Sequence, residues 1–150
     1  MRNLLVIGYG NELRGDDGVG PRVARAVAAL ARPGVWAVAA HQLVPEMADL
    51  VRGADGVVFV DAHVDAVAVE VRAITPGPIN SGWGHTSDPR WLLSLTRAVY
   101  DHTPPAWLVT IPATDLGMGD RLSEEATQGM AEALRRVLAL LESLKESACA

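Results

Sequence analysis

Blocks of apolar residues alternate with amphipathic segments along the chain. Continuous apolar runs are typical of strands buried on both faces of a sheet, and they cover residues 3–8, 35–41, 56–62, 66–74 and 106–114. Helical periodicity and helix-end signals predict helices over residues 19–31, 45–52, 88–101 and 123–147. This alternation predicts one α/β domain over residues 1–150, a three-layer α/β/α sandwich. Its sheet should hold about five strands, mostly parallel, with one antiparallel strand.

Single residues define the predicted helices more closely. The first helix should bury Val19, Val23, Val27 and Leu30 on one face. Asp88 is a typical N-cap for the third helix, with a proline in its first turn. The apolar stripe of the last helix consists of Met130, Leu134, Val137, Leu138, Leu141 and Leu144.

The fourth apolar run breaks the parallel pattern. Only three residues separate it from the third run, whereas a crossover between parallel strands needs about a dozen or more. We therefore expect residues 66–74 to pair antiparallel to a neighbour or to lie at an edge of the sheet. Residues 76–87 would then carry the chain back, since twelve residues reach about 40 Å and a typical strand spans about 20 Å. The third helix would begin at the carboxyl edge of the parallel strands.

Polar residues follow these strands where each of them ends. Ligands of open α/β sheets bind beyond the carboxyl ends of the strands. The first strand runs into Asn11, Asp16 and Asp17, the second ends at His41, and the third ends at Asp61 with His63 behind it; His85 precedes the third helix. We expect these groups to share one edge of the sheet.

The glycine-rich stretch after the first strand does not fit a dinucleotide site. Gly8 and Gly10 match only G-x-G, and Leu13 stands where the third glycine would be. Asp16 and Asp17 would also repel a pyrophosphate.

A divalent transition metal suits the same region better. Asp17 and Asp61 would supply oxygen ligands and His85 a nitrogen ligand. Plainer interpretations stay open: Asp16 as a helix N-cap, Asp61 as a turn cap, and His85 as a surface residue.

Composition excludes several classes of function. The net charge of -5 and the single lysine do not favour nucleic-acid binding, which needs clustered positive charge. One cysteine, Cys149, leaves no partner for an internal disulfide. The sequence has no apolar run of membrane-spanning length and no signal-peptide pattern, so we expect a cytoplasmic protein without a membrane partner.

The residues quoted above resemble a known family, the hydrogenase maturation proteases. The stretch GYGNELRGDDGVGPRV, residues 8–23, fits that family's G-x-G-N-x-L-x-x-D-[DE]-G-x-G pattern. Supporting matches are VVFVDA, the histidine in GWGHTSDP, and LSEEA before the last helix. These enzymes remove the C-terminal extension of the [NiFe]-hydrogenase large-subunit precursor, so the resemblance implies an aspartic-type or metal-assisted endopeptidase.

The resemblance also implies roles for individual residues. Asp17, Asp61 and His85 match the family's metal ligands. Nickel would be supplied by the substrate, with no organic cofactor, and the precursor would be the partner. Asp16, Asp17 and Asp61 are the candidates for catalysis, and we expect Asp16→Asn to do less harm than Asp17→Asn.

One departure from the family lies after the second strand. Many members carry an Asp-Gly-Gly-Thr-type segment there, whereas this chain has HQLVPEMA, residues 41–48. This leaves open whether His41, or the nearby Asn11, joins the site. Two alternatives also stay open: a hydrolase that holds its own zinc at the same residues, and a module that binds the precursor without cutting it.

Overall fold

A five-stranded mixed sheet forms the centre of the molecule in the computed structural model, which describes residues 3–78 and 88–148. In chain order the strands are β1 (Leu4–Tyr9), β2 (Val35–Ala40), β3 (Gly56–His63), β4 (Glu70–Ile74) and β5 (Ala106–Pro112). Their spatial order is β2-β1-β3-β5-β4, and all neighbours are parallel except β4 and β5. The predicted fold class is confirmed.

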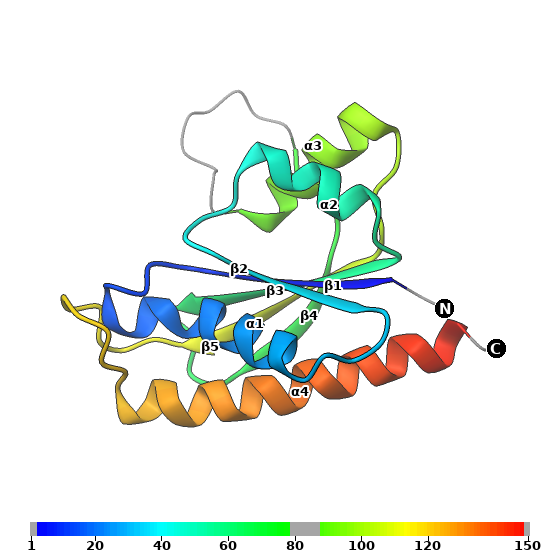
Figure 1. The fold of residues 1–150 in the computed structure, drawn as a ribbon. Coiled ribbons are helices and arrows are strands. Elements are labelled where there is room, and N and C mark those ends of the chain that lie inside the picture. Colours follow the sequence, from blue (N-terminus) through cyan, green and yellow to red (C-terminus); the bar gives the residue numbers. More distant parts are fainter. Residues whose placement is uncertain (1–2, 79–87, 149–150) are drawn as a thin grey trace.

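Helices cover both faces of this sheet (Figure 1). One face carries α1 (Val19–Ala29) and the long α4 (Glu124–Ala148). The other carries α2 (Ala48–Arg52) and α3 (Pro89–Tyr100). Two short 3-10 turns, η1 (Gly15–Gly18) and η2 (Pro45–Met47), lead into α1 and α2. None of the helices described is long and apolar enough to cross a lipid bilayer.

The two faces have separate apolar cores. On the α1 and α4 side, the predicted face of α1 is confirmed at Val19, Val23 and Val27, which are at most 1% exposed. Leu30 was predicted wrongly: it is 48% exposed, because α1 ends one residue before it. Toward the sheet, α4 also buries small residues that the predicted stripe left out, Ala126, Gly129 and Ala133.

The two predictions about the chain between β3 and β5 hold. Strand β4 is antiparallel to β5 and lies at an edge, although it begins at Glu70 rather than at residue 66. The N-cap of α3 is Asp88, whose Oδ1 accepts the backbone N–H of Arg90 at 2.9 Å. His85 lies outside the described residues.

Candidate active site

Close backbone packing brings the acidic loop against the ends of β1 and β3. A Cβ on Gly20 would lie 2.5 Å from the carbonyl oxygen of Val60, so the first turn of α1 packs directly on the sheet. Gly10 has a φ of +148°, and a Cβ there would lie 2.0 Å from the carbonyl oxygen of Asp17. Only glycine fits such positions. The glycines of this stretch therefore let the loop backbone pack closely against the strand ends, which fixes the position of Asp16 and Asp17.

The first acid of that pair is completely buried. Asp16 Oδ1 accepts the backbone N–H of Ser123 at 2.7 Å. Its Oδ2 accepts the backbone N–H groups of Thr114 and Asp115, each at 2.9 Å, and the Ser123 hydroxyl at 2.7 Å. Burial favours the neutral acid, but these hydrogen bonds stabilise the carboxylate and lower the pKa of Asp16 to about 2.

This environment gives Asp16 a structural role. Neither η1 nor α1 receives a side-chain cap from it, so the plain N-cap interpretation for its own helix is wrong. It joins the loop after β5 to Ser123, whose hydroxyl accepts the backbone N–H of Ala126 and so caps α4. A buried carboxylate that accepts this many hydrogen bonds and has so low a pKa is a poor general base. The catalytic role considered for Asp16 is not supported by this geometry.

The second acid, Asp17, bonds to the loop that follows β1 and interacts with an acid of β3. Asp17 Oδ2 accepts the backbone N–H of Asn11 at 2.6 Å. Asp61, at the carboxyl end of β3, is partly buried and close enough to feel the charge of Asp17. Burial raises the pKa of Asp61 to about 7, the Tyr9 hydroxyl opposes this rise, and the Asp17 charge adds to it. The Asp61 carboxyl is therefore only partly ionised near neutral pH, and Asp17 is its acidic neighbour.

Tyr9, the buried last residue of β1, lies close to Asp61. Its hydroxyl is buried and makes no hydrogen bond that meets the usual geometry among residues 3–78 and 88–148. It is nevertheless close enough to Asp61 to interact with the carboxylate. Burial and the negative charges of Asp61 and Asp88 raise the pKa of Tyr9 well above its usual range, so the hydroxyl stays protonated. Tyr9 could not be recognised as a site residue from the sequence, because a tyrosine within a buried strand is typical of a core residue.

The interaction of Asp88 with Tyr9 locates the start of α3. Asp88 caps α3, and Tyr9 is the last residue of β1. The third helix therefore begins near the carboxyl ends of the parallel strands, as predicted.

The histidines at the carboxyl ends of β2 and β3, His41 and His63, are not placed as metal ligands in the described part of the chain. His63 is exposed, and its Nδ1 accepts the backbone N–H of Asp65 at 3.1 Å. His41 is also exposed and lines a separate pocket. Across the described ranges, no cluster of three or more His, Cys, Asp or Glu side chains is arranged to hold a metal ion.

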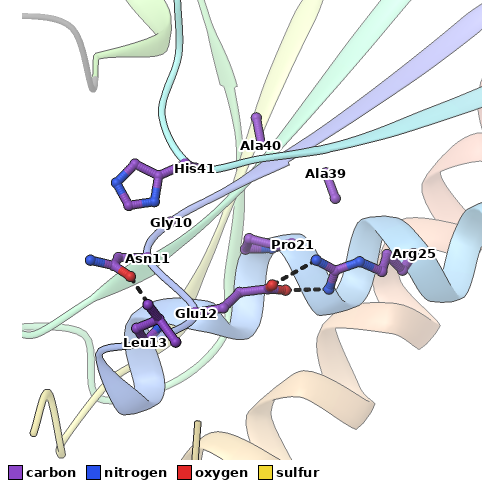
Figure 2. Close-up of a pocket in the computed structure, with 9 residues that line it drawn as sticks. All are labelled: Gly10, Asn11, Glu12, Leu13, Pro21, Arg25, Ala39, Ala40 and His41. Carbon is purple, nitrogen blue, oxygen red and sulfur yellow. Dashed lines mark hydrogen bonds and ion pairs between the residues drawn. The ribbon is translucent and has the colours of Figure 1, made fainter. Parts of the chain in front are cut away.

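The pocket beside the acidic loop has a volume of about 330 Å³ (Figure 2). His41 and Asn11 lie at one end of it, and the ion pair between Glu12 and Arg25 lies at the other. Arg25 Nη2 donates to Glu12 Oε2 at 2.6 Å. His41 and Asn11 were candidates from the sequence. The ion pair was not, since thirteen positions separate Glu12 from Arg25.

Comparison with known proteins gives a consistent result for the fold. The hydrogenase maturating endopeptidase HybD from E. coli superposes with a TM-score of 0.76 at 21% identity, over 95% of this chain and 93% of its own. The protein shares its fold with hydrogenase maturation proteases. The [NiFe] hydrogenase maturation protease HycI from Thermococcus kodakarensis KOD1 superposes with a TM-score of 0.73 at 21% identity, over 94% of this chain and 93% of its own.

An endopeptidase from Escherichia coli is similar to the same degree, with a TM-score of 0.74 at 22% identity over 95% of this chain and 93% of its own. No protein-family model matches the sequence, and a search of curated proteins finds no significant match. At this level of identity the likeness establishes the fold, so the function has to be argued from the site.

Proposed function

We propose that the protein is an endopeptidase that removes the C-terminal extension of a [NiFe]-hydrogenase large-subunit precursor after nickel insertion. The observation that carries this proposal is the pairing of Asp17 with Asp61 at the carboxyl edge of this fold. That edge is where open α/β sheets bind their ligands. The precursor would be processed in the cytoplasm.

The chemistry of the pair suits a cation carried by the substrate. Two carboxylates this close repel each other, and a positive charge between them would relieve that repulsion. One oxygen of Asp17 accepts the Asn11 N–H, which leaves the other oxygen for a ligand bond. Carboxylate oxygens together with an imidazole nitrogen suit nickel in a mixed site.

His85 is our proposed third ligand. It precedes Asp88 by three residues, and a chain of three residues spans at most about 10 Å. Since Asp88 interacts with Tyr9, which also interacts with Asp61, covalent geometry allows His85 to reach the same edge. We expect His85→Ala to abolish processing and to leave the unfolding transition unchanged.

In this proposal the chain's own groups bind, orient and accept a proton. Asp17 and Asp61 hold the nickel-bearing segment of the precursor so that the scissile carbonyl lies beside the positive charge. A carboxylate oxygen that is not a metal ligand accepts the proton of the attacking water. The new bond joins the water oxygen to the carbonyl carbon, the C–N bond breaks, and the leaving amine takes up a proton. Without nickel the central charge is missing, so the precursor should stay intact.

Incubation of the purified protein with its nickel-loaded precursor tests the proposal, with the mass of each product as the readout. Loss of a single C-terminal peptide is the expected result. A stable complex without cleavage would favour a precursor-binding module. Metal analysis of protein purified without added metal tests the other alternative, because tightly bound stoichiometric zinc would indicate a zinc hydrolase.

A further inference from the structure

The two edges of the sheet differ in how they are protected. Exposed edge strands invite pairing with other chains, and proteins commonly block them with charged residues or proline. The edge strand β4 carries Glu70 and Arg72. The opposite edge strand, β2, reads VWAVAA and has no charged residue and no proline.

The backbone of β2 has groups available for an added strand. Leu4 N–H donates to the carbonyl of Gly34 at 2.8 Å, and Gly10 N–H donates to the carbonyl of Ala40 at 3.1 Å. Since backbone groups alternate in direction along a strand, even-numbered residues of β2 face β1. Ala37 and Ala39 therefore point their N–H and C=O groups outward, where the described part of the chain places no further strand.

Cavities flank this edge on both faces of the sheet. On the α2 side, a mostly apolar cavity of about 310 Å³ lies against Trp36, Val38 and Leu50. Trp36 is 56% exposed and Leu50 is 46% exposed. On the α1 side, the pocket of Figure 2 begins at Ala39 and Arg25. A strand laid along β2 would point alternate side chains to the two faces, and therefore toward the two cavities.

The pocket on the α1 side borders the loop that holds Asp17. It contains Asn11, whose backbone N–H is the one that Asp17 accepts. We propose that the outward edge of β2 binds an extended segment of the protein substrate as an added β-strand and guides the adjoining peptide bond to Asp17 and Asp61. This inference rests on the proposed function. The segment should place an apolar side chain on the α2 side and a polar one on the α1 side.

Substitution of Ala39 tests the edge. Ala39→Pro removes an outward N–H, which is tolerated on the free side of an edge strand, so β2 should keep its pairing with β1. Ala39→Val keeps the N–H and has a side chain similar in size to that of proline, so it is the matched control. For cleavage of the nickel-loaded precursor, we expect the KM of Ala39→Pro to be about tenfold higher than that of Ala39→Val, with little change in kcat. A tenfold change corresponds to the loss of one net hydrogen bond. Equal KM values for the two variants would overturn the proposal.

Amide exchange in the wild-type protein gives a second readout that does not need cleavage. The N–H groups of Ala37 and Ala39 should exchange fast in the free protein and slow down when nickel-free precursor is added. Protection on binding without any cleavage of nickel-loaded precursor would support the edge and refute the proposed function. Cleavage without protection would refute the edge alone. Protection that depends on protein concentration, with no precursor present, would assign the edge to a second copy of the chain and overturn the proposal.

Discussion

Asp16 and Asp17 are neighbours in the chain, but they face different surroundings. Asp16 points toward the loop after β5, where it is fully buried and accepts hydrogen bonds from backbone and hydroxyl donors. Asp17 accepts the backbone N–H of Asn11 with one oxygen, and its charge acts on another carboxylate, Asp61. Hydrogen bonds lower the pKa of Asp16 to about 2, whereas burial and then Asp17 raise the pKa of Asp61 to about 7.

The different surroundings of Asp16 and Asp17 suit them to different roles, one in stability and one in chemistry. A carboxylate whose oxygens already accept hydrogen bonds from the protein stabilises the folded state. It has few free acceptor sites for a ligand. A carboxylate pair with few donors destabilises its own ionised form and is suited to a cation. In our proposal, Asp16 stabilises the fold, and Asp17 and Asp61 take part in the reaction.

The largest expected effect is on the reactive side. Asp17→Asn and Asp61→Asn should each reduce precursor processing at least about 100-fold, the scale of a lost acid–base or ligand group. The folded state should persist, because the amide oxygen of an asparagine at position 17 can still accept the Asn11 N–H. Single-turnover cleavage assays measure the loss.

Asp65→Asn is the matched control, since Asp65 is an exposed aspartate in the connection after β3. It should process the precursor at the wild-type rate. Wild-type rates for Asp17→Asn or Asp61→Asn would remove that residue from the site.

On the structural side, Asp16→Asn should lower the free energy of unfolding by about 2–4 kcal/mol, because an NH₂ group would face donors that now bind a carboxylate. For stability, this reverses the expectation from the sequence that Asp16→Asn would do less harm than Asp17→Asn. Urea denaturation measures the loss, and Asp17→Asn, measured alongside, should cost less than about 1 kcal/mol. A smaller loss at position 16 than at position 17 would contradict the division of roles.

The pH dependence of stability gives a second test of the role of Asp16. The pKa of Asp16 is lowered from 3.8 to about 2 on folding, so its contribution is present above pH 3.8 and is lost as the pH falls through about 2. The stability advantage of wild type over Asp16→Asn should therefore shrink by about 2 kcal/mol across that range. Urea titrations at a series of pH values follow the change. An advantage that stays constant with pH would show that the Asp16 charge does not stabilise the fold.

The smallest effect is expected at the ion pair of the pocket in Figure 2. Glu12→Gln should change the free energy of unfolding by less than about 1 kcal/mol, because the Glu12–Arg25 pair is exposed to solvent. Glu142→Gln breaks another exposed ion pair, with Arg32 at 3.1 Å, and should behave alike. Thermal denaturation of both variants checks this, and a loss above 2 kcal/mol at Glu12 would give the ion pair a structural role.

Most of the fold could be predicted from the sequence, because apolar runs, helix caps and glycines determine the structure of neighbouring residues in the chain. The N-cap at Asp88 and the antiparallel edge strand β4 follow from residue type and from the length of a connection. The small residues of α4 were missed, since a close helix–sheet approach depends on the partner surface.

The site could be predicted only in part. Topology alone placed Asp17 and Asp61 at one edge of the sheet. The partners of Asp16 could not be found, because Thr114 and Ser123 are about a hundred residues away in the chain and nothing local marks them.

Cleavage of matched precursors tests the central claim most directly. Wild-type protein is given nickel-loaded precursor, nickel-free precursor, and nickel-free precursor with added zinc, and the product masses are measured. If the Asp17–Asp61 pair is completed by nickel that the substrate carries, only the nickel-loaded precursor loses its C-terminal peptide, without added metal and in the presence of a mild chelator. Cleavage of the nickel-free precursor once zinc is added would contradict the account and point to a zinc hydrolase.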